Sequence, residues 1–112
     1  ILKISIPIRT QNEQNTREHW GTRARRAREQ RRFAAMALKP RLPDTLPRKL
    51  RILITRCGPR MMDPDGSIAS LKHVIDGIAD ALEIDDGDPR LERLYGQVVD
   101  SEYSVEITIQ NR

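Results

Sequence analysis

Apolar residues recur at helical spacing between residues 67 and 83, and this stretch constrains the fold of the chain more than any other. The recurring positions are Ile68, Leu71, Ile75, Ile78, Ala79 and Leu82. Apolar side chains three and four residues apart lie on one face of a helix, so the pattern predicts an amphipathic helix from about Ser67 to Glu83. An Asp-Pro-Asp-Gly turn at residues 63–66 precedes it, and a second turn at residues 85–89 follows it.

Alternating apolar residues predict strands on both sides of this helix. Residues 49–56 and 103–109 alternate cleanly, as half-buried strands do, and residues 91–99 are expected to form another strand. Residues 2–8 also alternate, but Pro7 cannot donate to a strand ladder. The first strand is therefore expected at an edge of the sheet.

A second helix is expected from about Arg17 to Leu38, with Thr16 as its cap and a thin apolar stripe that includes Trp20. A proline-rich connector at residues 40–47 ends it. The expected order is β-α-β-α-β-β, which predicts the α/β (α+β) class, with two main helices packed on a small mixed sheet. With 112 residues, the chain is expected to form a single domain, 1–112.

Charge is divided unevenly along the chain. Residues 1–62 hold 16 Lys and Arg against 4 Asp and Glu, whereas residues 63–112 hold 4 against 12. A basic half can follow phosphates, and an acidic cluster can hold a divalent cation, so two functional surfaces are expected. The single cysteine, Cys57, permits no internal disulfide and favours a reducing compartment such as the cytoplasm. No apolar run approaches the ~18 residues of a membrane span.

Arginines are concentrated in the first predicted helix. Residues 17–32 contain seven of them, opposed only by Glu18 and Glu29. Such a run favours nucleic acid through contacts with phosphate, and the alternative is a solvated helix face with intrahelical pairs. Seven arginines cannot be mostly paired by two glutamates, so nucleic-acid binding is the favoured interpretation. The candidate DNA-binding residues are Arg23, Arg25, Arg26, Arg28, Arg31, Arg32 and Arg60.

Aspartates flank the second predicted helix on both sides. Asp63 and Asp65 precede it, and Asp85, Asp86 and Asp88 follow it. Oxygen ligands of this kind suit Mg²⁺ or Mn²⁺, which can support phosphodiester hydrolysis. The same residues also fit ordinary turns and helix caps, and spacing alone favours that second interpretation.

Lys72 lies close to the apolar stripe of the same helix. A lysine there can stabilise the charge that develops on a phosphate during its transfer. The alternative is an ordinary pair with Asp76, four residues further along the helix. The sequence leaves both roles open.

The stretch from Arg60 to Gln97 resembles the RusA-type Holliday-junction resolvases of phages and prophages. It contains Asp-Pro-Asp-Gly, then a helix with a lysine that ends near Asp-Ala-Leu, then Asp-Asp. The resemblance covers about a third of the chain. It implies a homodimeric, Mg²⁺-dependent endonuclease that cuts four-way DNA junctions in recombination and repair.

Carried over to this chain, the resemblance implies specific roles for five residues. The metal ligands would be Asp63, Asp65 and Asp86, the catalytic lysine would be Lys72, and Asp85 would be the neighbour of the third ligand. Gly66 stands where the family has asparagine. A relative that binds DNA without cutting it is therefore the alternative, and a structural interaction domain is a more distant one.

The length of the second helix has a geometric consequence. An unbroken helix of 17 residues, from Ser67 to Glu83, is about 25 Å long. The few residues that separate Asp65 and Asp86 from its ends span at most roughly 17 Å. Unless the helix breaks, for example at Gly77, the two aspartates cannot reach one ion within one chain. The acidic site is therefore expected to be completed across a symmetric dimer.

Overall fold

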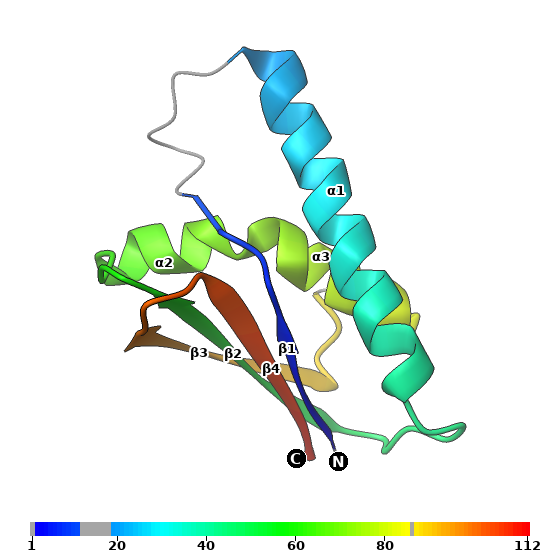
Figure 1. Ribbon diagram of the computed structural model, residues 1–112. Coiled ribbons are helices and arrows are strands. Elements are labelled where there is room, and N and C mark those ends of the chain that lie inside the picture. Colours follow the sequence, from blue (N-terminus) through cyan, green and yellow to red (C-terminus); the bar gives the residue numbers. More distant parts are fainter. Residues whose placement is uncertain (1, 12–18, 86) are drawn as a thin grey trace.

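The computed structural model describes residues 2–11, 19–85 and 87–112, which form a four-stranded sheet with three α-helices (Figure 1). The strands are β1 (Leu2–Ile6), β2 (Leu50–Gly58), β3 (Leu91–Val99) and β4 (Ser104–Asn111). The helices are α1 (Trp20–Leu38), the short 3-10 helix η1 (Lys39–Arg41), α2 (Pro64–Ser70) and α3 (Lys72–Leu82). The predicted α+β class and small mixed sheet are confirmed.

The strands lie in the order β1-β4-β2-β3. β2 runs parallel to β3 and antiparallel to β4, and β1 pairs with β4, which places β1 at an edge as predicted. Neighbouring parallel strands need a crossover connection, and here α2 and α3 supply it. The first strand ends at Ile6, directly before Pro7, earlier than predicted. The predicted strands 49–56 and 103–109 lie at 50–58 and 104–111 instead.

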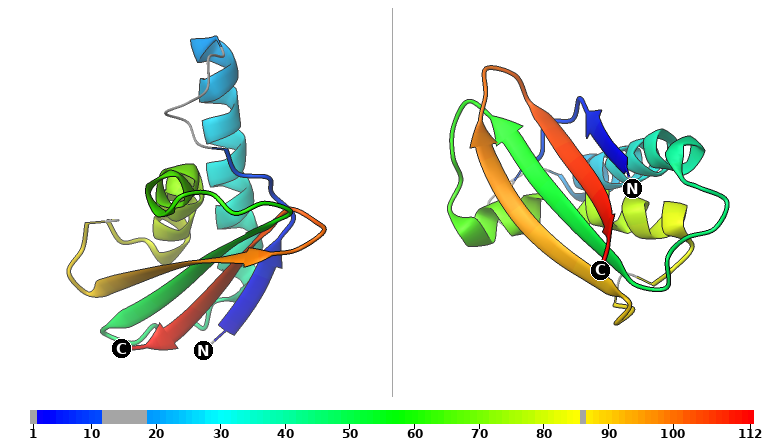
Figure 2. Two further views of the ribbon diagram at one scale, coloured as in Figure 1. Left: turned by 90° about the vertical axis from the view of Figure 1, so that its left-hand side faces the viewer. Right: turned by 90° about the horizontal axis from the view of Figure 1, so that it is seen from below.

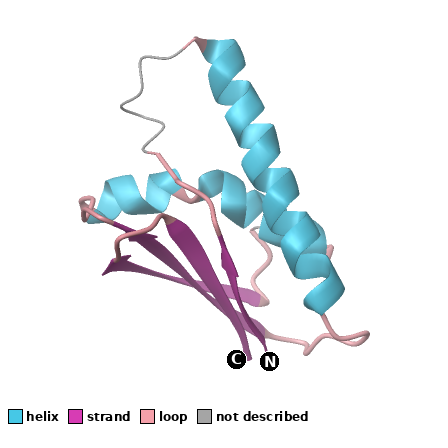
Figure 3. Cartoon of the chain, in the orientation of Figure 1, coloured by secondary structure: helices cyan, strands magenta, loops and turns pink. Residues whose placement is uncertain are grey.

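The helices cover one face of the sheet and leave the other face bare (Figures 2 and 3). Alternation along the strands decides which side chains face the helices. Ile54 and Ile107 are registered neighbours on β2 and β4, and both are fully buried. They pack with the stripe of α3, where Val74 and Ile78 are almost completely shielded from solvent. Each such burial stabilises the fold by about 1.5–3 kcal/mol.

The predicted helix 67–83 is two helices, because the chain departs from α-helical geometry at Leu71. The Ser70 hydroxyl donates to the carbonyl of Ser67, 2.7 Å away. The Leu71 N–H bonds to the carbonyl of Ile68 instead, at 3.1 Å. A side chain that bonds the preceding turn competes with the helical ladder, and it accounts for the break at this position. The break therefore lies at Leu71 and not at Gly77, where we suggested that one could occur.

Gly77 instead marks the place where α1 crosses α3. A Cβ atom at this position would lie 2.8 Å from the Cβ of Ala34 and would also run into the backbone carbonyl of Arg31. Only glycine lets the two helices approach this closely. The crossing fixes the lower half of α1 on the body of the molecule, and the upper half extends away from it (Figure 1).

Two predictions about the first helix need correction. Trp20 was expected in an apolar stripe, but 75% of it is exposed. The helix begins at Trp20, and the side chain of His19 caps it by accepting the Gly21 N–H at Nδ1. Thr16 and Arg17, the expected cap and first residue, lie outside the described residues. None of the helices in the described part of the chain combines the length and the apolar character that crossing a membrane requires.

Candidate nucleic-acid and metal site

The first acidic pair occupies the N-terminal end of α2. Asp63 is its N-cap, and one carboxylate oxygen accepts the Gly66 N–H at 3.1 Å. Asp65 follows in the first turn of the helix, and both aspartates are exposed. A capping role, which spacing favoured for these aspartates, is thus confirmed for this turn, and Asp63 holds it. Among the described residues, the Asp65 side chain makes no hydrogen bond, and Asp65 is exposed to solvent.

Two side chains from the sheet hold the loop that leads into this turn. Gln97 on β3 brackets Met62, accepting its N–H at 2.9 Å and donating to its carbonyl at 2.8 Å. Arg56 on β2 donates from Nη1 to the carbonyl of Arg60 at 2.9 Å. Arg56 and Gln97 are registered neighbours on the parallel strands. The acidic turn is therefore anchored to the sheet from both strands.

Arg56 is an unusual anchor because it is only 5% exposed. Its Nε atom is buried without a hydrogen-bond partner, and no carboxylate in the described part of the chain lies within ion-pair distance. Burying an unbalanced charge is costly, so a cation in this position indicates a role that outweighs its cost. In this structure its visible role is to fix the backbone three residues before Asp63.

Lys72 begins α3, and its Nζ atom lies 3.4 Å from an oxygen of Asp76. The pair with Asp76 that the sequence suggested is therefore present. The side chain of Lys72 is 69% exposed, so the pair is a weak tether. Lys72 lines a pocket of about 310 Å³ against Arg93 and Tyr95 of β3. Next to it lies a pocket of about 240 Å³ that reaches the acidic turn at Pro64.

Asp76 is an acidic residue that the sequence reasoning did not assign to a site. It lines the Lys72 pocket, and it also lines a smaller pocket of about 140 Å³ with Asp80 and Asp85. Asp80 is held there by Arg31 of α1, whose Nε and Nη2 bond its two oxygens at 2.6 and 2.8 Å. These hydrogen bonds lower the pKa of the Asp80 carboxyl, because they stabilise its charged form. The ion pair between Asp80 and Arg31 thus links α3 to α1.

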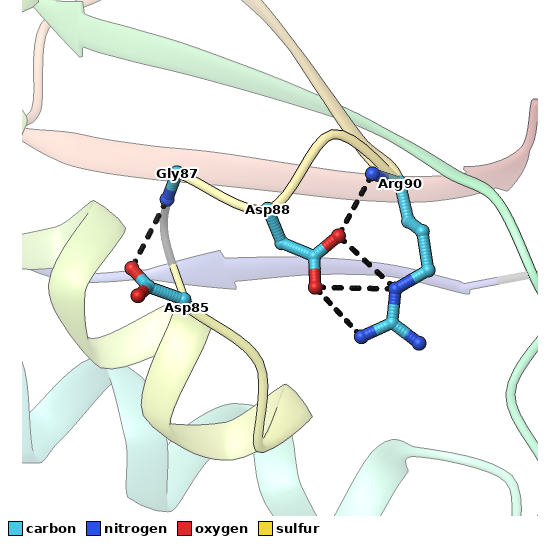
Figure 4. Close-up of polar contacts among 4 residues, drawn as sticks. All are labelled: Asp85, Gly87, Asp88 and Arg90. Carbon is cyan, nitrogen blue, oxygen red and sulfur yellow. Dashed lines mark hydrogen bonds and ion pairs between the residues drawn. The ribbon is translucent and has the colours of Figure 1, made fainter.

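In the second acidic turn, Asp85 and Asp88 form hydrogen bonds with other residues of the same turn (Figure 4). Asp85 accepts the Gly87 N–H at 3.2 Å. Asp88 accepts from the guanidinium of Arg90, with a shortest distance of 2.7 Å, and from the Arg90 backbone N–H. Hydrogen bonding to Arg90 lowers the pKa of Asp88 to about 2. Asp86, the implied third metal ligand, lies outside the described residues.

The two acidic turns lie at opposite ends of the α2–α3 segment (Figure 1). Nineteen residues from Pro64 to Leu82 separate them, a path of about 28 Å along the helices despite the break. Within the described ranges, no group of three His, Cys, Asp or Glu side chains could hold a metal ion. Asp63 and Asp65 nevertheless fit Mg²⁺ in their chemistry, since one or two carboxylates, with water and substrate phosphate, are its usual ligands.

The predicted DNA-binding arginines differ in their surroundings. Arg25, Arg28 and Arg32 are exposed and share one face of α1, since they are three and four residues apart. Arg23 and Arg26 are half-buried, and Arg31 is bound to Asp80. The remaining candidate, Arg60, is exposed in the loop before the acidic turn. One basic residue therefore stands beside the turn, and the others follow α1.

Comparison with known proteins gives no family assignment, since no protein-family model matches the chain and no curated protein does. The resemblance to the RusA-type resolvases therefore rests on the motif between Arg60 and Gln97.

Proposed function

We propose that this protein is a Mg²⁺-dependent DNA endonuclease of the RusA type that cuts four-way junctions in the cytoplasm of a bacterium or an infected host. The observation that carries the proposal is the acidic turn. It offers the carboxylates of Asp63 and Asp65 to solvent on a loop anchored by Arg56 and Gln97. Catalytic ligands need this kind of rigid support, because small displacements of a reacting group cost large factors in rate.

The chain supplies distinct groups around the turn. A Mg²⁺ ion bound by Asp63 and Asp65 would supply Lewis-acid stabilisation and an activated water. Arg60, three residues before Asp63, would hold the DNA backbone. Lys72 would stabilise charge that develops on the phosphate or the leaving oxygen. Its exposed pair with Asp76 contributes only ~0.3–0.5 kcal/mol, so releasing it costs little.

The proposed enzyme is a homodimer in which Asp86 of one copy joins Asp63 and Asp65 of the other. The separation of the two acidic turns within one chain supports this arrangement. A two-fold dimer also matches a four-way junction, which offers two symmetric cleavage points. The exposed face of α1 with Arg25, Arg28 and Arg32 would hold the arms of the junction.

A second candidate function is DNA binding without cleavage. Gly66 supports it, because the family motif has asparagine there. In this structure Gly66 is buried, and its N–H donates to the carboxylate of Asp63. The basic helix would then be the whole of the functional surface.

The two functions separate in one cleavage assay. Synthetic four-way junctions and linear duplexes are incubated with the protein, with Mg²⁺ or with EDTA. Symmetric nicks that require Mg²⁺ are expected, and Asp65→Asn should abolish them. Asp44→Asn is the matched control, since Asp44 is equally exposed but lies in the connector after α1. Tight junction binding without nicks would favour the non-catalytic function, and no preference for junctions would contradict both.

A further inference from the structure

Helix α1 extends well beyond its crossing with α3. Its crossing with α3 lies at Arg31 and Ala34, opposite Gly77. Gln30, the residue before Arg31, donates to the carbonyl of Arg9 at 3.3 Å. From Arg31 back to Trp20 there are eleven residues, so the tip of the helix lies about 16 Å beyond the crossing. Figure 1 shows this end of α1 standing clear of the sheet and of α2.

Trp20 occupies a core-type position at this end of α1. It lies eighteen residues before Leu38, which corresponds to about five full turns of helix, so the two share one face of α1. Leu38 and Ala34 on that face are fully buried. Trp20, by contrast, is 75% exposed, and its recorded ring contact is with His19, 5.4 Å away between centroids. The large apolar ring of Trp20 is thus exposed at the end of α1 that lies furthest from the hydrophobic core.

The charge around Trp20 indicates what could cover it. Glu29 is the single acidic residue among the nineteen residues of α1, against six arginines. Arg25 and Arg28 are exposed about 1.4 and 2.2 turns further along the helix from the tryptophan. A polyanion suits this surface, and a protein partner would have to be strongly acidic. Nucleic acid combines phosphates for the arginines with flat bases that stack on indole rings.

We propose that Trp20 is a base-stacking residue, which packs against an unpaired or unstacked base of a nucleic acid held by α1. The proposal rests on the DNA-binding part of the function proposed above, and it adds the chemistry by which branched or single-stranded DNA is distinguished from a continuous duplex. Bases in a regular duplex are stacked on their neighbours, whereas those at a branch point or in a single strand offer a free face.

Trp20 is the only tryptophan of the chain, so its fluorescence reports directly on its surroundings. The protein is titrated with a fluorescein-labelled single-stranded oligodeoxynucleotide for anisotropy, and with the same unlabelled strand for tryptophan emission. The expected result is strong quenching that follows the binding curve. A strand of equal length with abasic sites should bind through its phosphates with much weaker quenching.

Variants test the same contact without relying on emission. Trp20→Ala should weaken binding of the single strand by roughly tenfold, because stacking on one base is lost. Trp20→Phe should restore most of the affinity. Met36→Ala is the matched control, since Met36 is an exposed apolar residue near the other end of α1. Thermal melting should give the same midpoint for all of these variants, because neither side chain is packed.

Three outcomes would overturn the proposal. If the strand binds while Trp20 emission stays constant and Trp20→Ala keeps full affinity, stacking is excluded and DNA binding by α1 stands. If Trp20→Ala instead turns a dimer into a monomer in sedimentation without DNA, the ring belongs to a contact between two copies. If no DNA binds to the wild type, the DNA-binding part of the proposed function fails as well.

Discussion

Asp63 has a structural contact and a free oxygen at the same time. One carboxylate oxygen caps α2, and the other remains available beside Asp65. The position of both depends on the loop before them, where Gln97 brackets Met62 through two hydrogen bonds. The precision of the candidate site therefore depends on Gln97 of β3, which holds the residue directly before Asp63.

Gln97→Ala tests this support. Losing both hydrogen bonds to Met62 should lower the free energy of unfolding by about 1–3 kcal/mol, since the backbone groups of Met62 lose their partner. The Met62 amide should also exchange with deuterium faster, by NMR or mass spectrometry. Gln110→Ala, on an exposed position of β4, should change neither quantity. Equal exchange in both variants would mean that the loop does not depend on Gln97.

Asp88 gives a pH-dependent prediction at the same scale. Its pKa falls from 3.8 to about 2 because the Arg90 guanidinium and backbone N–H bond its charged form. A lowered pKa stabilises the folded state above the unfolded pKa, and the contribution is lost as the pH falls from about 4 through 2. Asp88→Asn should therefore be less stable than wild type in urea at pH 7, and the difference should shrink toward pH 2. A constant difference across that range would contradict the pairing.

At the scale of elements, the crossing of α1 and α3 depends on Gly77. Gly77→Ala should lower the free energy of unfolding by about 1–3 kcal/mol, because the new methyl group meets the Arg31 carbonyl and Ala34. The midpoint of urea unfolding measures the change. Gly87→Ala is the control, since a Cβ there would meet nothing closer than 3.9 Å. If both variants unfold at the same midpoint, the helices do not pack as closely as described.

Most elements could be predicted from local periodicity. Alternation located β2 and β4, and the stripe ending at Leu82 located α3, because a half-buried element must repeat its apolar residues with its own period. The break at Leu71 could not be predicted this way. It depends on the Ser70 hydroxyl, whose bond to Ser67 is invisible to a pattern of apolar residues. Trp20 was misplaced because its helix face is apolar in pattern, but the core ends before reaching it.

Only part of the candidate site could be predicted from the sequence. The acidic turn and Lys72 stand in a recognisable motif, whereas Arg56 and Gln97 meet the turn only through the parallel register of β2 and β3. A signal for Arg56 did exist, since it continues the inward-facing series of Leu50, Ile52 and Ile54. A charged residue in such a series is a reason to look for a polar partner near the strand end.

At the scale of the whole molecule, the basic and acidic parts of the sequence lie in different regions of the fold. Helix α1, which carries six arginines, extends to one side, and the acidic turns lie at the two ends of α2–α3 (Figure 1). In the proposed dimer, each chain would contribute half of a metal site at each of these two ends. If two copies are related by a two-fold axis, as proposed, Asp65 of one would join Asp86 of the other twice, which would give two equal cleavage sites.

Mixing two inactive variants tests this arrangement most directly. Asp65→Asn and Asp86→Asn are each expected to be inactive on a four-way junction with Mg²⁺. Unfolded together and refolded as a mixture, they should regain about a quarter of the wild-type cleavage, because half of the dimers are mixed and each of those has one intact site. A mixture that stays as inactive as its parents, beside an active wild type, would show that each chain holds its ligands alone.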